Sequence, residues 1–448
     1  MKARMHLAFD ISFTHLDGRW RTPGSWTGRT YPNTDIFEEV ARIGERGCID
    51  MIFFGDGTGI PNTWEGSEQA AARWGIQWPR HDVSPWIPLM ARATKHIGFC
   101  LTYASTFMHP FYVSRLLNSL DHVTGGRIAF NVITSSRRAD AMNYGFDELM
   151  EHGSRYDRME EFVDVCKALW ESVGPDAFVW DRESGEVADP TKVQPINHKG
   201  KFFNVRGPLN AVPSPQGRPV LIQAGSSGRG IKASAHVADH VFASSHAMNI
   251  RIKHRAELDA ALIAEGRDPA EVGILWGVQL VVAETAQEAA ARKENILKIV
   301  PRGEAVGTYI SHNAGYDFSK LPARFTLNDL NAEIAATNAS PVGFVHQLAN
   351  EIGGDTEITR EELLEHGLRS ATAYNRTIAG TPAQVADHLE EIFEATGNRG
   401  GFMFSHPVST PRDLLSVVDF LVPELRRRGR FRNEYEGTTL RENMTLDR

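Results

Sequence analysis

Length, composition and charge limit what this chain can be. It has 448 residues, of which 42% are hydrophobic and 23% are charged, and these values are typical of a globular protein with a large core. The formal net charge of −8 argues against nucleic acid and anionic membranes as partners, because both need a basic protein face. No stretch approaches the roughly 18 consecutive apolar residues of a membrane span.

The cysteines and the first residues indicate the compartment. Cys48, Cys100 and Cys166 are far apart and form no CxxC pair, so a zinc ribbon or a dithiol centre is not supported. Reduced, buried thiols in a reducing compartment are expected instead. The first apolar run is broken at Asp10 and lacks a cleavage site, which favours a first strand over a signal peptide. We therefore expect a cytoplasmic protein.

Short, apolar, β-rich runs alternate with longer helical patterns along the chain. The runs predict strands at residues 5–11, 49–55, 97–103, 127–133, 219–225, 240–245, 275–283 and 401–406. Near-continuous apolar runs are typical of parallel strands that are buried on both faces, and the intervening segments show helical spacing of Leu and Val. Eight strands, each followed by a helix or an insertion, predict an α/β fold of the (β/α)8 TIM-barrel type. An open doubly wound sheet stays possible, because strand order is not visible in a sequence.

Three stretches do not fit the βα repeat. Residues 174–217 are rich in Pro, Gly and Asp and predict a long excursion with one hairpin. Residues 300–380 contain helical pieces without a clean βα unit, and within a single barrel domain over 1–448 they predict a lid-like insertion between late strands. The polar segment 426–448 predicts a tail that wraps a neighbouring subunit or is partly mobile.

The turn after the fifth expected strand indicates the type of ligand. There a strand runs into a Gly-Ser-Ser-Gly turn and then into a helix, so the N–H groups of the helix start and the hydroxyls of Ser226 and Ser227 suit a phosphate. A plain helix N-cap is an equally good interpretation of this local pattern. A Rossmann dinucleotide site is poorly supported, because no GxGxxG with a suitably spaced acidic residue follows a strand.

Metal chemistry has less support. The chain has 17 histidines but no HExxH motif and no HxH after the first strand. His236 and His240 are four residues apart, which is more typical of a helix face than of a ligand pair. A metal-dependent barrel hydrolase is therefore a weaker alternative, and no metal ligands are assigned.

Five stretches of the chain resemble the luciferase-like flavin-dependent monooxygenases, in the branch that includes nitrilotriacetate and dibenzothiophene-sulfone monooxygenases. These stretches are IDMIFFGDG, ATKHIGFCLTYASTFMHPFYVSRLLNSLDHVTGGRIAFNVITS, NYGFDELMEHGSRYDRMEEFVDVCKALW, HKGKFFNVRGPLNAVPSPQGRPVLIQAGSSGRG and FRNEYEGTTLRENM. The match as a whole covers nearly the whole chain in order. The resemblance implies a barrel that binds FMN at its C-terminal rim and forms a homodimer or homotetramer. It also implies a separate NAD(P)H:flavin reductase that supplies reduced FMN.

The resemblance also implies where the flavin binds. Contacts to the flavin ring are implied at Asp56, Thr102 and Asn131. Contacts to the phosphate are implied at His152, Tyr156, Ser226 and Ser227, which agrees with the interpretation of the Gly-Ser-Ser-Gly turn. Taken alone, Asp56 could cap the next segment, and Tyr156 could be a core aromatic.

Catalytic and substrate-binding residues are implied by the same resemblance. His15 and His312 match the positions of histidines that contact the reacting groups or act as acid or base near neutral pH. Phe9, Phe53 and Phe242 match positions that line the substrate pocket, although a Phe is more often a core residue. In this family reduced FMN reacts with oxygen, while the protein excludes water and orients the substrate.

The substrate itself cannot be read from the residues. We expect a small organic compound, aromatic or heterocyclic, that is oxygenated and cleaved, because several tryptophans follow the first strand: Trp20, Trp26, Trp64, Trp74 and Trp78. Packing of the first loops is the alternative role for these side chains. Other functions stay open, namely a riboflavin-degrading flavin-dependent lyase that yields lumichrome and a sugar fragment, a non-catalytic flavin-binding barrel, and a deazaflavin-dependent enzyme.

Overall fold

Eight parallel strands close into a barrel in the computed structural model, which describes residues 2–11, 19–26, 32–135, 137–245, 247–336, 343–405 and 410–445. Around the barrel each strand pairs with its two neighbours, and β9 closes the ring by pairing with both β8 and β13. The strands are β1 (His6–Asp10), β2 (Met51–Phe54), β3 (Gly98–Ala104), β4 (Ile128–Ile133), β7 (Val220–Ala224), β8 (His240–Ala243), β9 (Gly273–Val282) and β13 (Gly400–Ser405). The predicted TIM barrel is confirmed, with strand ends shifted by at most two residues.

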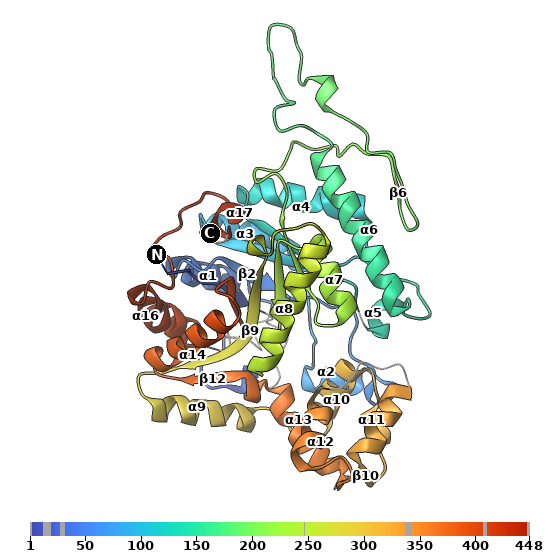
Figure 1. Cartoon of the computed structure of the whole chain (residues 1–448), viewed down its shortest axis with the longest axis vertical. Coiled ribbons are helices and arrows are strands. Elements are labelled where there is room, and N and C mark those ends of the chain that lie inside the picture. Colours follow the sequence, from blue (N-terminus) through green and yellow to red (C-terminus); the bar gives the residue numbers. More distant parts are fainter. Residues whose placement is uncertain are drawn as a thin grey trace.

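Helices surround the barrel, as Figure 1 shows. They include α1 (Thr34–Arg46), α4 (Pro110–Thr124), α6 (His152–Glu171), α7 (Gly228–Val237), α8 (Met248–Ala264) and α14 (Pro382–Ala395). Local sequence explains where they begin and end. The Asn33 side chain caps α1 by accepting from the N–H of Asp35, while Pro110 opens α4 and Gly125 ends it in the left-handed conformation.

Two hydrophobic layers result from the alternation of side chains along each strand. Ile52 and Phe54 of β2 point outward into the large cluster between barrel and helices, whereas Met51 and Phe53 point into the barrel interior. The three cysteines are buried and unpaired, as expected. Among the described residues, no helix has the length and apolar character needed to span a bilayer.

The excursion between α6 and β7 projects away from the barrel (Figure 1). It starts at the end of α6 that is far from His152 and contains the antiparallel pair β5 (His198–Lys199) and β6 (Asn204–Val205). Further bridges join Val173 to Val193 and Phe178 to Ala188. The excursion therefore emerges at the N-terminal end of the barrel strands.

The insertion after β9 is built from its own helices and has its own hydrophobic cluster. After α9 (Ala286–Ile299) come α10 (Glu304–Ala314), β10 (Arg324–Thr326), α11 (Leu327–Ala336), α12 (Gly343–Ile352), β11 (Glu357–Thr359) and α13 (Arg360–Ala371). Phe318, Leu330 and Leu363 are at its centre, and Trp64 from the segment after β2 joins them. The chain returns through β12 (Thr377–Gly380), which pairs with the far half of β9 as an unexpected ninth strand.

The C-terminal segment closes the N-terminal end of its own barrel. Helix α17 (Leu440–Asn443) places Leu440 in the barrel interior together with Met444, and both side chains are almost completely buried. Nearby, Arg432 forms a buried ion pair with Asp50. The expectation of a tail that wraps a neighbour or is partly mobile is therefore wrong for the described residues, because apolar side chains spaced along this polar segment fill the end of the barrel.

Candidate active site

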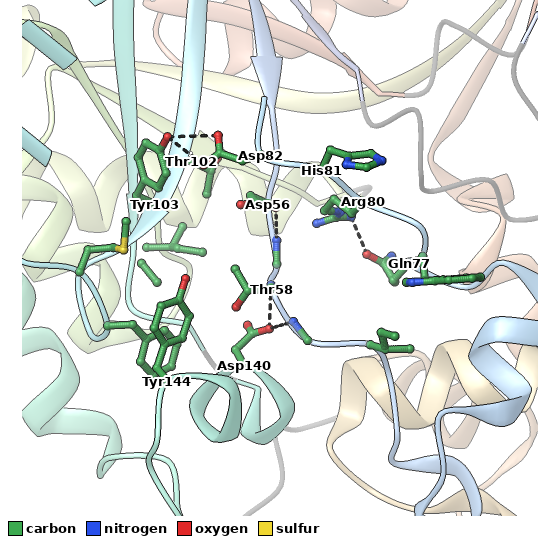
Figure 2. A pocket seen from close by; sticks show the side chains of 18 residues that line it. Asp56, Thr58, Gln77, Arg80, His81, Asp82, Thr102, Tyr103, Asp140 and Tyr144 are labelled. Carbon is green, nitrogen blue, oxygen red and sulfur yellow. Dashed lines mark hydrogen bonds between the residues drawn. The ribbon is translucent and has the colours of Figure 1, made fainter. Parts of the chain in front are cut away.

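A cavity of about 310 Å³ opens at the C-terminal ends of β2, β3 and β4. Figure 2 shows side chains from separate segments facing it. Its walls come from the loop after β2, from residues 77–82, from the end of β3 and from Tyr144. In TIM barrels this end of the strands carries the functional groups. The cavity is therefore where the predicted site should lie.

Asp56 and Thr102 both line this cavity. The carboxylate of Asp56 accepts from the N–H of Gly57 at 2.8 Å. Burial raises the pKa of Asp56, although the nearby Arg80 opposes the shift. Two of the three residues implied for the flavin ring therefore lie in one cavity, Asp56 just after β2 and Thr102 on the adjacent β3.

Asn131 lies next to Thr102, opposite it in the register of β3 and β4. Its side-chain amide donates to the Thr102 hydroxyl at 2.9 Å, while its Oδ1 is buried without a hydrogen-bond partner in the described part of the chain. A buried acceptor left unpaired costs about 1–3 kcal/mol. Such an acceptor is suited to a ligand that brings an N–H donor.

The residues implied for the phosphate meet at the start of α7. The Ser227 hydroxyl caps this helix by accepting from the N–H of Gly230 at 3.0 Å. A Cβ on Gly230 would lie 3.0 Å from the Tyr156 hydroxyl and 3.1 Å from the Ser227 hydroxyl, so both hydroxyls close around this glycine. Together with the exposed Ser226 they form a hydroxyl-rich turn at a helix N-terminus, which favours an anion.

Two further side chains adjoin this turn. The His152 ring, at the start of α6, lies edge-on to the Tyr156 ring with the centroids 5.1 Å apart. On the other side, the Arg229 guanidinium lies 5.4 Å from the Tyr156 ring centroid and is held by Glu160 and Asp157. The sequence interpretation missed Arg229, although it directly follows the Gly-Ser-Ser-Gly turn.

Of the two predicted catalytic histidines, His312 lies on α10 near the cavity, and His15 lies outside the described residues. Burial first, and then the positive charges of Arg137 and Arg80, lower the pKa of His312 to about 3. Its Nε2 is buried and has no partner in the described part of the chain. The imidazole is therefore neutral near pH 7 and can orient a ligand, but it is not the acid that a histidine with an ordinary pKa would be.

The three predicted pocket phenylalanines separate into two layers. Phe53 and Phe242 face each other inside the barrel with ring centroids 5.7 Å apart. Phe9 is instead buried between the barrel and α1, against Phe404 and Gly44. The structure does not support a pocket role for Phe9, because successive side chains on β1 point to opposite faces and Ala8 is the one that faces inward.

No group of three or more metal-ligating side chains occurs among the described residues. Arg80, Arg137 and Gly57 are residues at the rim that the sequence interpretation missed. Gly57 belongs to the GDGTG stretch after β2, which by itself is too weak a motif to identify a site. The arginines gave no signal, because charged residues in loops are usually solvated.

Comparisons with known proteins place the chain in a family. A family model described as luciferase-like monooxygenase matches residues 18–399. N-acetyl-S-(2-succino)cysteine monooxygenase from Bacillus subtilis is 35% identical over 97% of this chain and 94% of its own length. Nitrilotriacetate monooxygenase component A from Aminobacter aminovorans is 35% identical, with 98% and 95% of the two chains covered.

A solved structure is similar over almost the entire chain. It is a riboflavin lyase with modified FMN and riboflavin, and it superposes with a TM-score of 0.87 at 26% identity, covering 98% of this chain and 95% of the other. These matches confirm the family that the motifs resemble, over the full barrel and its insertions. The chain therefore belongs to the luciferase-like monooxygenases.

Proposed function

We propose that this chain is the oxygenase of a two-component flavin-dependent monooxygenase. It takes reduced FMN from a separate NAD(P)H:flavin reductase and uses molecular oxygen to oxygenate a small organic substrate. The observation that carries this proposal is the hydroxyl-rich turn at the start of α7, on the same rim as Asp56, Thr102 and Asn131. Support also comes from the relative named as component A and from the similar structure that holds FMN.

The residues at the rim fit FMN at both ends of the molecule. The phosphate end suits Ser226, Ser227 and Tyr156, where hydroxyls meet a helix N-terminus. The ring end suits Asn131, whose unpartnered Oδ1 would accept from a ring N–H. When bound, FMN supplies the electrons that activate oxygen. The protein's own part is to hold the flavin, orient the substrate and keep water out.

Water exclusion is the role we assign to the insertion. Trp74 of the segment after β2 donates from its indole N–H to Glu304 at 2.5 Å, and the Trp64 ring packs against Gly307. These contacts join α10 to the rim and bring His312 close to the cavity. A dry site strengthens the hydrogen bonds and charges that orient a substrate. The insertion would thus act as the lid-like cover of the site.

The proposal extends to compartment and assembly. Buried free cysteines suit a cytoplasmic protein. The projecting excursion has an apolar surface in which Trp180 is 64% exposed beside the exposed Val179 and Val187. A second copy of the chain would cover such a surface in a homodimer or homotetramer. Light scattering coupled to size-exclusion chromatography would measure the oligomeric state. A monomer would contradict the proposed homodimer or homotetramer.

The flavin site is tested by combining Tyr156→Phe with Ser227→Ala. We expect FMN to bind at least ~10-fold more weakly, because two hydroxyl donors to the phosphate are lost at about 1 kcal/mol or more each. Fluorescence quenching of FMN gives the affinity. The control is Thr285→Ala, which removes a similar N-cap from α9 and should leave the affinity unchanged. Equal affinity in the double variant and the wild type would refute the assignment.

Turnover is tested by anaerobic titration with reduced FMN, followed by isotopically labelled oxygen and a product scan that includes riboflavin. Labelled oxygen in an organic product would support the monooxygenase. Lumichrome as the product would instead support the riboflavin lyase, which is the second candidate because of the similar solved structure. No binding of FMN in either redox state would overturn the proposal.

A further inference from the structure

Two arginines meet above Gly57 at the rim. A Cβ at residue 57 would clash with Nη1 of Arg137 and would lie 3.4 Å from Nη1 of Arg80. Both guanidiniums therefore reach the same point above the glycine. Arg80 comes from the loop that precedes η3 (Ser84–Trp86), and Arg137 comes from the turn between β4 and α5 (Arg138–Asn143). Two segments that are far apart in the sequence thus deliver like charges to one place.

The two charges differ in how they are balanced. Arg80 donates to the Gln77 side chain at 2.9 Å, and the carboxylates of Asp56 and Asp10 lie close enough to offset its charge. Burial, reinforced by the charge of Arg137, lowers the pKa of Arg80 to about 10, so it is still a cation near pH 7. In the described part of the chain, the Arg137 guanidinium has neither a hydrogen bond nor an ion pair.

Asp140, a further acid in the cavity wall, uses its carboxylate oxygens for other hydrogen bonds and forms no ion pair with Arg137 in the described residues. One carboxylate oxygen of Asp140 accepts from the N–H groups of Thr58 at 2.9 Å and Gly59 at 2.6 Å, and the other accepts from the Ser135 hydroxyl at 2.8 Å. Asp82, on the far wall, receives hydrogen bonds from the Ser84 N–H and the Tyr103 hydroxyl. The N–H groups of Arg137 are therefore the unengaged donors of this rim.

His312 adds a group from the insertion side. The charges of both arginines help to lower the pKa of its imidazole, which is neutral near pH 7. Its buried Nε2 has no hydrogen-bond partner in the described residues. The opposite wall is aromatic, with the Tyr144 and Phe107 rings stacked 4.8 Å apart. Figure 2 shows Arg80 and Gln77 across the pocket from Tyr103 and Tyr144. A ligand in this cavity would face these aromatic rings and Arg80, with the carboxylates of Asp56, Asp82 and Asp140 also in the walls.

We propose that Arg137 and Arg80 form an arginine subsite that binds a carboxylate group of the substrate, so that the substrates of this enzyme are small organic carboxylates. A planar guanidinium with unengaged N–H groups matches the planar carboxylate, which it can bind through two parallel hydrogen bonds. This inference rests on the proposed monooxygenase function, because it names the substrate class of the same site.

The test compares a charged probe with a neutral one of the same shape. Succinate and succinamide are titrated at constant ionic strength into FMN-loaded and FMN-free protein, and binding is followed by calorimetry. The wild type should bind succinate at least ~10-fold more tightly than succinamide, and Arg137→Gln should abolish this preference. Arg137→Lys should retain part of the preference for succinate, because lysine keeps the positive charge but lacks the planar guanidinium that donates two parallel hydrogen bonds. Arg138→Gln, at the exposed neighbouring position, is the matched control and should retain all of it.

The outcomes separate this inference from the proposed function. No preference for succinate in the wild type, or an unchanged preference in Arg137→Gln, overturns the arginine subsite even if FMN binds. Failure to bind FMN overturns the proposed function. The titration of FMN-free protein still tests whether the arginine subsite prefers succinate to succinamide. If Arg137→Gln weakens reduced FMN more than oxidised FMN and leaves succinate binding intact, Arg137 serves the reduced flavin and the inference is wrong. Thermal unfolding of each variant confirms that it is folded.

Discussion

The two ends of the barrel differ in how their buried carboxylate and amide side chains are hydrogen-bonded. At the N-terminal end, Asp50 accepts from the N–H of Leu7 at 2.8 Å, from Arg432 at 2.5 Å, and contacts His6 at 3.1 Å. At the C-terminal end, Asn131 and His312 each have a buried atom without a partner in the described residues. Barrels place chemistry at the C-terminal end and stability at the other. The N-terminal end also has an unpaired atom, Nδ1 of His240, but of these atoms only the Asn131 oxygen lies on the rim beside the cavity, where a ligand can complete its hydrogen bonding.

The largest expected effect on stability is at the N-terminal end of the barrel, the closed end, which the C-terminal segment fills. Burial opposes ionisation of Asp50, but Arg432 and His6 outweigh it and lower the pKa of this carboxyl, so it is a buried anion. Arg432→Met removes its main partner and should lower the free energy of unfolding by about 3–5 kcal/mol. Urea unfolding measures this value. Arg42→Met, which breaks an exposed ion pair with Glu38, is the control and should cost about 0.5 kcal/mol or less.

A matched pair of asparagines compares the two ends directly. Asn443 is buried at the closed end and uses its whole side chain, accepting from the Gly437 N–H and donating to the carbonyls of Gly437 and Thr439. Asn443→Leu should cost about 2 kcal/mol or more, because its backbone partners lose their bonds. Asn131→Leu should instead leave stability unchanged or raise it by about 1 kcal/mol, because an unpaired oxygen is removed. FMN affinity should fall only in Asn131→Leu. Equal losses of stability would remove the contrast between the ends.

Acid should weaken the closed end through His240. Its Nε2 donates to the carbonyl of Met444 at 3.0 Å, while its Nδ1 is buried without a hydrogen-bond partner among the described residues. Burial first, and then His6, lower the pKa of His240 to about 4. The unfolded chain takes up this proton near pH 6.5 and the folded chain only near pH 4, so the stabilisation is present above the unfolded pKa and is lost as the pH falls toward 4.

Between about pH 7.5 and 5 this linkage should cost the wild type at most ~2 kcal/mol of unfolding free energy. His240→Gln should show a flatter pH dependence over the same window. His388→Gln changes an exposed histidine and should follow the wild type. A slope that His240→Gln leaves unchanged would assign the acid sensitivity to another group.

The smallest effect is expected at an outer surface, at His236. Hydrogen bonding to Asp164 raises its pKa to about 9, against the effect of burial and with help from Glu265. The stabilisation is therefore fully present below about pH 6.5 and is lost as the pH rises through 9. His236→Gln should cost less than ~1 kcal/mol at neutral pH, since solvent screens a side chain that is 35% exposed. The difference from the wild type should shrink toward pH ~9.5 and in high salt, and a difference that persists would point to packing.

Much of the fold could be predicted, because its signals are local. An apolar run marks a buried strand wherever it occurs, and eight such runs separated by helical segments indicated the barrel. Phe9 shows the limit of such local patterns. Whether its side chain faces the barrel interior or the surrounding helices depends on the register of β1, and a shift of one residue would reverse it. The four-residue strand β12 was missed, because it is short and is stabilised only by pairing with β9.

For the candidate site, the sequence alone determined the family, through motifs that span the chain, and the hydroxyl-rich turn, because a strand, a turn and a helix start are contiguous. Only the tertiary structure decided that the C-terminal segment fills its own barrel, that Arg80 and Arg137 meet above Gly57, and that His312 lies within range of their charges. These residues come from three segments that are far apart in the sequence. Their meeting depends on strand order and on how the insertion packs against the rim, and neither leaves a local pattern of residues.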